Sequence, residues 1–332
     1  MNHDHISLSG ELLLDVQGLR TWFHTREGIV KAVDGVSLQL RQGEILGLVG
    51  ESGSGKSITG FSLLNLVDEP GRMRADRLFF DGQDLQKLSP EEYRHLRGRD
   101  MAMIFQDPST TLNPVLRIDT QMIEAVQAHQ PISRRAARAR ALEVLKKVGI
   151  PAPEERLRVY PHHLSGGMRQ RIAIAIALLN SPKLIIADEP TTALDVTIQG
   201  QILYEVQKLC RETGTALIWI THDLAIVSGL ADRLAVMYAG RIVETAPTSQ
   251  IIGAAQHPYT HGLVSSIPSV QTRGHDLFQI PGSTPSLLNL PVGCPFRTRC
   301  YRASAQCESD PVLEEVAPGH WVSCWHKGVE KT

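Results

Sequence analysis

The chain has 332 residues, long enough for about two domains, each with a core of its own. Its 34 lysine and arginine residues are balanced by 35 aspartate and glutamate residues, and this net charge of −1 argues against binding nucleic acid through a basic surface. The longest unbroken apolar run, Ile172 to Leu179, is much shorter than the ~20 residues of a membrane-spanning helix. The N-terminal residues lack the pattern of a secretory signal, so we expect a reducing compartment without disulfides.

Short runs rich in valine, isoleucine and leucine alternate with helix-like stretches along much of the chain. Such runs are typical of strands buried on both faces of a parallel sheet. The sequence therefore predicts an α/β fold whose core is a mostly parallel sheet with flanking helices. The predicted buried strands are Glu44–Val49, Met101–Phe105, Leu184–Ala187, Leu217–Ile220 and Leu234–Met237.

Between about residues 114 and 182 the strand pattern gives way to helical periodicity, which predicts an all-helical subdomain inserted into the sheet domain. Within it, Ser133–Val148 is predicted to be an amphipathic helix that buries Leu142, Leu145 and Val148. The basic residues of this helix then form a solvated face rather than a nucleic-acid-binding patch; they are Arg134, Arg135, Arg138, Lys146 and Lys147.

The composition changes near residue 245. Prolines crowd the segment from Pro247 to Pro295, and four cysteines lie between Cys294 and Cys324. We therefore predict a sheet domain at residues 1–245 and a separate, loop-rich C-terminal region at residues 246–332.

A glycine-rich segment, Gly50–Ser57, lies between a predicted strand and an apolar helix predicted at Ile58–Val67. It matches the Walker A pattern, which requires this setting between a strand and a helix. In that pattern, backbone N–H groups and the start of the helix surround phosphate oxygens. Lys56 is then predicted to reach the β- and γ-phosphates of ATP, and Ser57 to bind Mg²⁺. The alternative, a glycine loop that only tightens a strand–helix turn, does not need the Lys-Ser pair. The predicted ATP-binding residues of the loop are Gly50, Ser52, Gly53, Ser54, Gly55, Lys56 and Ser57.

The apolar strand that begins at Leu184 ends in two acids, Asp188 and Glu189. The carboxyl end of a buried parallel strand delivers such side chains to a phosphate site. Asp188 is predicted to bind Mg²⁺, and Glu189 to act as the general base for the water that attacks ATP. The alternative, an acid that caps the next helix after Pro190, would account for one of the pair but not for both.

A second anion site is predicted at Leu164–Arg171. Ser165 is a residue that favours the start of a helix, Gly166 and Gly167 leave the backbone bare, and an apolar helix follows. Because Gly50–Ser57 already holds the phosphates of this subunit's nucleotide, we expect Ser165, Gly166 and Gly167 to meet a nucleotide held by a second subunit.

In its ordered motifs the sequence resembles the ATP-binding-cassette (ABC) ATPases over about residues 12–245, although Met168 replaces the glutamine of their LSGGQ signature. The resemblance implies a P-loop NTPase fold and a catalytic role for the Walker A and B residues. Gln106, after a strand, would bind Mg²⁺ or water and sense a transmembrane partner. The motifs Ala193-Leu194-Asp195 and Ile220–Asp223 imply that Asp195 crosses the dimer interface and His222 holds the γ-phosphate. Phe23, or otherwise Trp22, would stack on adenine.

The spacing of Cys294, Cys300, Cys307 and Cys324 suggests a metal site, because four thiolates in a reducing compartment suit tetrahedral zinc or an iron–sulfur cluster. His320 and His326 are alternative ligands, four unligated cysteines remain a further alternative, and Cys210 is predicted to be a small core residue. The segment Gln256–Thr260, followed by these cysteines, resembles the C-terminal extension of dipeptide and oligopeptide importer ATPases. That resemblance implies a [4Fe–4S] cluster, with zinc as the alternative.

These features together predict an ATPase that energises a membrane importer of dipeptides or oligopeptides from the cytoplasmic face of the membrane. The resemblance implies two separate permease subunits, a second ATPase that is a sister protein rather than a copy, and an extracytoplasmic binding protein. Residues 107–114 resemble a segment of peptide importers near the permease contact.

The alternatives are another cargo, such as nickel or glutathione, a soluble ABC ATPase that acts on nucleic acid or the ribosome, and a regulatory subunit without turnover. The single P-loop and the near-zero charge argue against nucleic acid, and the presence of both Glu189 and His222 argues against loss of turnover.

Overall fold

The computed structural model describes residues 10–192, 194–267 and 278–328, and the chain divides into two compact units. Each unit is assembled from separated segments, so the chain passes between the units more than once. Unit 1 comprises Met1–Leu12, Arg41–Glu44 and Lys87–Ile218, and unit 2 comprises Leu13–Leu40, Ile45–Gln86 and Trp219–Thr332. The predicted domain division at residue 245 stays a prediction.

The central strands of unit 2 are β3 (Ile45–Val49) and β10 (Arg233–Tyr238), which pair in parallel. Both are almost wholly buried, which confirms the predicted strands at these positions. Beyond β10 the sheet continues with the antiparallel strands β11 (Arg241–Pro247), β13 (His320–Val322) and β12 (Glu314–Ala317). The prediction of a mostly parallel sheet is therefore corrected here to a mixed sheet.

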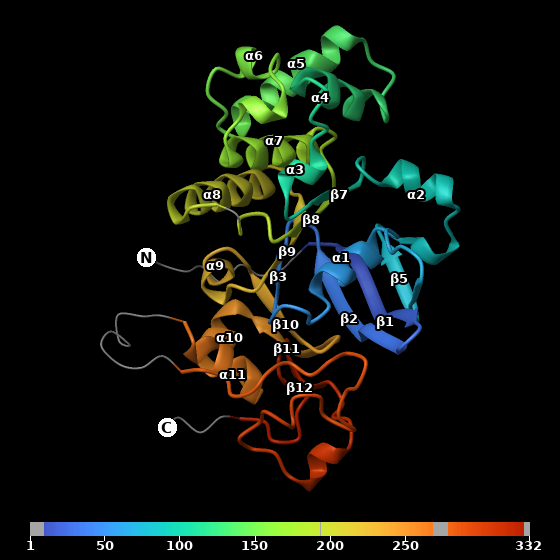
Figure 1. The fold of residues 1–332 in the computed structure, drawn as a ribbon, viewed down its shortest axis with the longest axis vertical. Helices are drawn as coiled ribbons and strands as arrows, with labels where there is room; N and C mark the ends of the chain where they lie inside the picture. Colours follow the sequence, from blue (N-terminus) through green and yellow to red (C-terminus); the bar gives the residue numbers. More distant parts are fainter. Residues whose placement is uncertain (1–9, 193, 268–277, 329–332) are drawn as a thin grey trace. The chain divides into compact units, whose positions relative to one another are not determined.

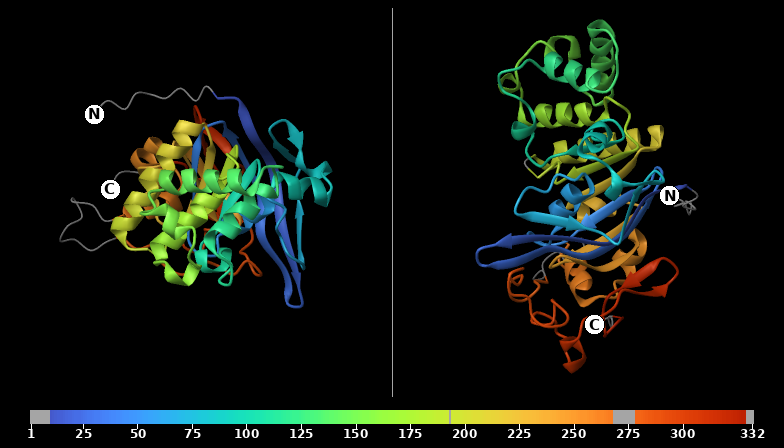
Figure 2. Two further views of the ribbon diagram at one scale, coloured as in Figure 1. Left: turned by 90° about the horizontal axis from the view of Figure 1, so that it is seen from above. Right: turned by 90° about the vertical axis from the view of Figure 1, so that its right-hand side faces the viewer.

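Unit 2 also contains a second, antiparallel sheet, which was not predicted from the sequence. Two long strands, β1 (Leu12–Thr25) and β2 (Gly28–Arg41), lie side by side (Figures 1 and 2). The strand β1 also pairs with β4 (Gly71–Arg74) and with β5 (Arg77–Phe80), which pairs in turn with β6 (Gln83–Asp84). Exposed and buried residues are mixed along β2, so this strand has no continuous apolar run of the kind that marks a parallel strand.

The helix α1 (Lys56–Leu63) directly follows the glycine-rich loop. It begins two residues before the predicted Ile58 and ends before the predicted Val67. The early end follows from the backbone, because Asn65 adopts a left-handed φ of +51° that does not continue a helix.

In unit 1 the parallel strands β7 (Met101–Ile104) and β8 (Leu184–Asp188) pair with each other. The strand β9 (Ala216–Thr221) is next to β8 in the strand order, and only its first three residues belong to unit 1. All residues of β8 and β9 are buried, as predicted. The helices of this unit are α2 (Pro90–Leu96), α3 (Pro108–Thr111), α4 (Ile118–Gln127), α5 (Arg134–Lys147), α6 (Pro153–Arg156), α7 (Gly166–Leu178) and α8 (Val196–Thr213), with a 3₁₀ turn at Pro161–His163. A further 3₁₀ turn, Leu85–Lys87, lies where the chain passes from unit 2 to unit 1. Every described element between β7 and β8 is helical.

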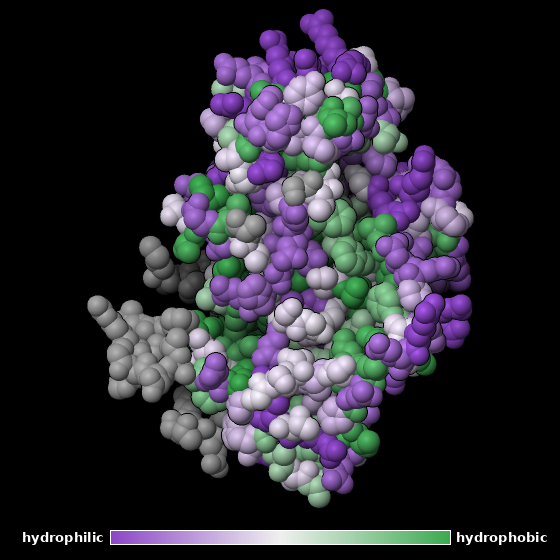
Figure 3. Space-filling view, in the orientation of Figure 1, coloured by the Kyte–Doolittle hydropathy of each residue, from purple (hydrophilic) through white to green (hydrophobic). Residues whose placement is uncertain are grey.

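The amphipathic character predicted for α5 is confirmed. Ala137, Ala141, Val144 and Leu145 are buried, whereas Leu142 is only half-buried. The basic residues Arg134, Arg135, Lys146 and Lys147 are exposed and Arg138 is half-buried. The visible face of α4 to α6 is mostly hydrophilic (Figure 3). This face is therefore solvated, as the apolar spacing predicted.

The C-terminal part of unit 2 contains α9 (Leu224–Ser228), α10 (Thr248–Ala254), α11 (Pro258–Ser265) and a 3₁₀ turn at Ala305–Glu308. Residues 278–304 contain no helix or strand, in agreement with the prediction of a loop-rich region. An aromatic cluster joins β10, α11 and this loop segment: the rings of Tyr238, Tyr259 and Phe296 lie 4.6 to 5.3 Å apart between centroids. In the described part of the chain, no helix combines the length and the apolar character needed to span a bilayer.

Candidate functional site

The Walker A loop connects the end of β3 to the start of α1. Gly55, in a left-handed conformation, precedes the first residue of the helix, Lys56. The buried ammonium of Lys56 donates hydrogen bonds to the carbonyl oxygens of Gly50 (2.8 Å) and Glu51 (2.9 Å) and to Ser54 Oγ (3.3 Å). Lys56 thus closes the loop on itself and holds a positive charge at its centre. Ser52 and Gly53 are exposed, and Ser57 is half-buried on the first turn of α1.

This loop can bind an anion through its backbone. The first N–H groups of a helix have no partner within the helix and carry the positive end of its dipole. In a loop that also contains a fixed lysine, these groups suit a polyphosphate. The ATP-binding roles of Gly50, Ser52, Gly53, Ser54, Gly55, Lys56 and Ser57 stay predictions.

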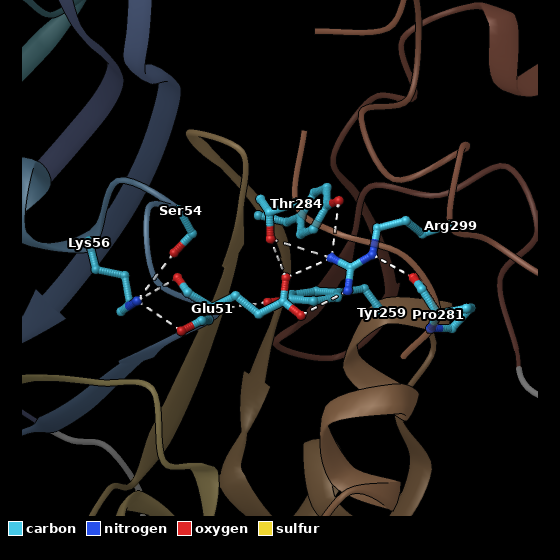
Figure 4. Close-up of polar contacts among 9 residues, drawn as sticks. Glu51, Ser54, Lys56, Tyr259, Pro281, Thr284 and Arg299 are labelled. Carbon is cyan, nitrogen blue, oxygen red and sulfur yellow. Dashed lines mark hydrogen bonds and ion pairs between the residues drawn. The ribbon is translucent and has the colours of Figure 1, made fainter. Parts of the chain in front are cut away.

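The second residue of the loop, Glu51, is bound to the C-terminal part of the chain (Figure 4). Its carboxylate accepts hydrogen bonds from Arg299 Nη1 (2.6 Å), Arg299 Nη2 (3.0 Å) and Thr284 Oγ1 (2.6 Å). Its backbone N–H donates to Tyr259 Oη at 2.8 Å. Sequence reasoning missed these partners, since Arg299 lies 248 residues from Glu51 and no local pattern connects them.

The ion pair shifts the pKa values of both members. Burial alone would raise the pKa of Glu51, but the hydrogen bonds from Arg299 and Thr284, with the charges of Arg299 and Lys56, outweigh it and lower that pKa. The Glu51 carboxylate in turn raises the pKa of Arg299. Both groups are therefore charged at neutral pH. Tyr259 remains neutral, because burial and the nearby Glu51 charge raise its pKa.

The Walker B acids lie at the end of β8 in unit 1. Asp188 is buried, and Glu189 follows it half-buried with a left-handed φ of +43°. Non-glycine residues rarely adopt such a φ, and those that do are concentrated at functional sites. The Glu189 carboxylate accepts hydrogen bonds from Thr192 Oγ1 (3.0 Å) and Gln106 Nε2 (3.4 Å).

The structure thus brings two predicted catalytic residues, Gln106 and Glu189, into contact within unit 1. Gln106 also lines a pocket of about 210 Å³ together with Gly166 of the signature motif and Leu194. Three segments that are distant in sequence therefore meet around one cavity. Lys56 belongs to unit 2, so the assembly of Walker A and Walker B around a single nucleotide stays a prediction.

The signature motif and the segment that contains Asp195 both begin helices. Ser165 caps α7 by accepting a hydrogen bond from the backbone N–H of Met168 at 3.3 Å, and Asp195 caps α8 by accepting one from Ile198 at 3.0 Å. Ser165, Gly166 and Asp195 are exposed and Gly167 is half-buried. They are accessible to another molecule, as the predicted roles of the signature residues at a second nucleotide and of Asp195 at a dimer interface require. Ala193 lies outside the described residues.

The remaining candidates are His222, Phe23 and Trp22, which lie in or directly after other strands. His222 is exposed directly after β9, where Asp223 caps α9 by accepting from the backbone N–H groups of Ala225 and Ile226. Phe23 and Trp22 are both half-buried near the end of β1. The ammonium of Lys31 lies 4.9 Å from the centre of the Trp22 ring. The roles of His222 at the γ-phosphate and of Phe23 or Trp22 at adenine stay predictions.

All five cysteines lie in the described residues as free thiols. Cys210 is fully buried in α8, as predicted, and burial raises its pKa to about 12. The pKa of Cys324 is raised to about 11, first by burial and further by the charges of the other three C-terminal cysteines: Cys294, Cys300 and Cys307. These four sulfur atoms therefore lie within electrostatic reach of one another.

The structure does not show the predicted metal site itself. Within the described residues, no group of three or more histidine, cysteine, aspartate or glutamate side chains is arranged to hold a metal ion. The alternative ligands have other partners, because His320 Nε2 lies 2.7 Å from Glu244 Oε1 and His326 Nε2 lies 2.7 Å from Ser304 Oγ. Neither a [4Fe–4S] cluster nor zinc is therefore established by this geometry.

Comparison with known proteins connects both parts of the chain to transporters. Residues 33–192 match the family described as ABC transporter, and residues 243–307 match the one described as oligopeptide/dipeptide transporter, C-terminal region. The oligopeptide transport ATP-binding protein OppD of Bacillus subtilis is 47% identical over 94% of this chain and 88% of its own length. The dipeptide transport ATP-binding protein DppD of Escherichia coli is 46% identical over 94% of this chain and 96% of its own length. The chain belongs to the family of oligopeptide and dipeptide ABC transporter ATP-binding proteins.

Solved structures agree with this membership. The dimeric structure of the bacterial ABC transporter cassette MJ0796 has a TM-score of 0.64 and 27% identity, and the match covers 71% of this ABC protein and 99% of that chain. The cbiO1 protein of Clostridium perfringens, part of an ABC transporter complex, has a TM-score of 0.61 and 26% identity, with 72% of this chain and 90% of that chain covered. The predicted P-loop NTPase fold of the ABC type is thereby confirmed.

Proposed function

We propose that this chain is the ATP-hydrolysing subunit of a membrane importer for dipeptides or oligopeptides. The observation that carries the proposal is the near-complete match to peptide-transport ATP-binding proteins, which extends over both the cassette and the C-terminal region. The P-loop, the Walker B acids and the signature motif supply the parts that ATP hydrolysis requires. A peripheral position on the cytoplasmic face of the membrane follows from this role.

Each group of the site has a role in ATP hydrolysis under this proposal. The Walker A backbone and Lys56 hold the phosphates, and His222 contacts the γ-phosphate. Glu189 takes a proton from the attacking water, whose oxygen bonds to the γ-phosphorus while the bond from that phosphorus to the β–γ bridging oxygen breaks, releasing ADP and phosphate. The hydrogen bonds from Gln106 and Thr192 orient the Glu189 carboxylate for this step.

The oxygen donors of the site fit Mg²⁺. The Asp188 carboxylate, the Ser57 hydroxyl and the Gln106 amide oxygen are hard ligands of the kind that Mg²⁺ prefers beside phosphate oxygens. When bound, Mg²⁺ would neutralise negative charge on the phosphates. The protein contributes by placing the buried Asp188 at a strand end and Ser57 on the first turn of α1.

A second ATPase subunit completes the site in this proposal. Ser165, Gly166, Gly167 and Asp195 would contact the nucleotide or the interface of the partner, and their accessibility supports this role. The solved MJ0796 cassette to which this chain is similar is a dimer. Closure of two subunits around ATP adds the last hydrogen-bond donors and couples binding to movement of the permeases. The partner is a sister ATPase, two permease subunits form the membrane path, and an extracytoplasmic binding protein delivers the peptide.

The C-terminal cysteines are proposed to hold a [4Fe–4S] cluster, with zinc as the alternative. The donor chemistry supports a metal, since backbone N–H groups already approach sulfur: Arg302 N lies 3.4 Å from Cys300 Sγ and His326 N lies 3.3 Å from Cys324 Sγ. Hydrogen bonds of this kind stabilise metal-bound thiolates. Because no metal-holding group is found among the described residues, this proposal requires Cys294, Cys300, Cys307 and Cys324 to draw closer together on binding.

The decisive experiment is the ATPase activity of the reconstituted importer with the Glu189→Gln variant. The variant should bind ATP but turn over ~10²–10⁴-fold more slowly, because it lacks the general base. Glu91→Gln is the matched control: Glu91 is exposed on α2, so its variant should retain wild-type turnover. Undiminished hydrolysis by Glu189→Gln would remove Glu189 from this role. Copurification with ribosomes or DNA instead of permeases would overturn the transport function.

A further inference from the structure

The phosphate-binding loop and the loop-rich C-terminal segment are joined by a charged contact between Glu51 and Arg299 (Figure 4). Both guanidinium nitrogens Nη1 and Nη2 donate to the Glu51 carboxylate, at 2.6 and 3.0 Å. Such two-point pairing fixes direction as well as distance. Tyr259 and Thr284 add uncharged hydrogen bonds to the same loop residue, so Glu51 is held through both its backbone and its side chain.

Arg299 is itself held rigidly. It is only 8% exposed, and its Nε donates to the carbonyl oxygen of Pro281 at 2.8 Å. The guanidinium carbon lies 5.9 Å from the ring centres of both Tyr238 and Phe296. A buried guanidinium with restricted rotamers loses little further side-chain entropy when it forms an ion pair. The position of its own segment then fixes the position of the carboxylate that it binds.

The ion pair between Glu51 and Arg299 also offsets a negative charge within the loop. A cradle for a triphosphate must attract negative charge, yet Glu51 places a carboxylate beside Gly50 and Ser52 within it. Without a counter-charge that carboxylate would repel the phosphates and would compete for the Lys56 ammonium, which already donates to the Glu51 carbonyl oxygen. The guanidinium cancels the carboxylate and leaves the charge of Lys56 for the ligand.

We propose that Arg299 is a positioning residue for the ATP site: it neutralises Glu51 and holds the Walker A loop in its phosphate-binding form, so that ATP affinity depends on the C-terminal region. The inference rests on the proposed function, because it takes the loop to bind ATP. Arg299 does not contact the nucleotide in this scheme. Its effect reaches the phosphates through Glu51 and the loop backbone.

A charge-cancellation experiment tests the proposal with the full chain and Mg·ATP as the probe. Dissociation constants are measured by titration, which reports affinity independently of the fraction of active protein. Arg299→Gln should weaken ATP binding about tenfold, which corresponds to ~1.4 kcal/mol of binding free energy. The double variant Glu51→Gln/Arg299→Gln, which has no unpaired carboxylate in the loop, should recover most of the affinity that Arg299→Gln loses. Arg299→Lys, which keeps the charge but not the two-point geometry, should fall between wild type and Arg299→Gln.

The matched control is Arg297→Gln. Arg297 lies in the same segment but pairs with Glu308 at 3.5 Å, so its variant should bind ATP like the wild type. In the reconstituted importer, Arg299→Gln should raise the KM for ATP about tenfold with little change in kcat, since the catalytic groups are intact.

Three results would overturn the proposal: a double variant no tighter than Arg299→Gln, an equal loss in Arg297→Gln, or a fall in kcat at unchanged KM. Each would mean that Arg299 only stabilises the fold of the C-terminal segment. Failure of the proposed function is distinguishable, because the wild-type chain itself would then show no Mg·ATP binding.

Discussion

Gly50, at the junction of β3 and the Walker A loop, has a φ of +156° and is packed against backbone. A Cβ at this position would lie 2.1 Å from the carbonyl oxygen of Met237, which no side-chain rotation can relieve. Gly53, in the same loop, also has a positive φ (+76°), but a Cβ there would meet no heavy atom within 4 Å. Glycine is therefore favoured at residue 50 by close backbone packing, and at residue 53 by the backbone conformation alone.

At this scale we predict that Gly50→Ala lowers the free energy of unfolding by ~2–4 kcal/mol, because the clash forces the loop backbone to move. Gly53→Ala should cost only ~1 kcal/mol, the strain of a left-handed alanine. Urea denaturation of both full-length variants measures the difference. Equal losses would show that conformation, and not the contact with Met237, makes glycine necessary at residue 50.

At the scale of elements, a buried network joins β11, β13 and α11. The fully buried carboxylate of Glu244 accepts hydrogen bonds from the backbone N–H groups of Gln256 (2.7 Å) and His257 (2.9 Å) and lies 2.7 Å from His320 Nε2. His257 then caps α11, because its Nδ1 accepts a hydrogen bond from the backbone N–H of Tyr259 at 3.0 Å. This cap requires an imidazole whose Nδ1 carries no proton.

The cap predicts a pH dependence of stability. Burial lowers the pKa of His257 to about 4, although the charge of Glu244 opposes the shift. Between pH ~6.5 and ~4 the unfolded chain binds a proton that the folded chain excludes, so the free energy of unfolding should fall by up to ~3 kcal/mol as the pH drops through this window. His257→Asn keeps a cap acceptor and removes the titration, so its melting temperature should fall less between pH 7 and 5 than that of the wild type. Parallel pH profiles for the two proteins would contradict this account.

At the scale of the whole molecule, the C-terminal segment at residues 278–304 is held by individual contacts and not by regular secondary structure. Residues 278–304 contain no helix or strand, and the segment depends on the Arg299 pair, the aromatic cluster around Phe296 and backbone contacts such as Cys294 N–H to Cys307 O at 3.0 Å. A region with so small a core commonly gains stability from a metal or a disulfide. The proposed cluster would therefore act as a structural staple.

We predict that the protein purified without oxygen is brown, with broad absorbance near ~400 nm from thiolate-to-iron charge transfer. Iron and sulfide analysis would give the cluster stoichiometry, and Cys307→Ser should abolish the colour and lower the melting temperature. Cys210→Ser is the control, since Cys210 is buried in α8 and should leave the colour unchanged. A colourless preparation with stoichiometric zinc would select the alternative metal, and one with neither metal would contradict the site.

Local patterns in the sequence were sufficient for the buried strands, the Walker A loop, the start of α7 at Ser165 and the amphipathic α5. Each depends on residues close together in the chain, where apolar period, glycine conformation and helix capping act directly. The antiparallel sheet that contains β1 and β2 was missed because exposed residues occur among the buried ones. Such strands lack the continuous apolar runs by which fully buried strands are recognised.

By itself the sequence predicted which residues bind phosphate, act as general base and supply thiolates, because these capacities belong to side chains and to short motifs. The tertiary structure alone decided that Gln106 touches Glu189, that Glu244 joins three elements, and that Glu51 pairs with Arg299 across 248 positions. The physical reason is that ion pairs and hydrogen bonds act over a few ångströms in space. Only the folding of the chain brings distant residues within that range.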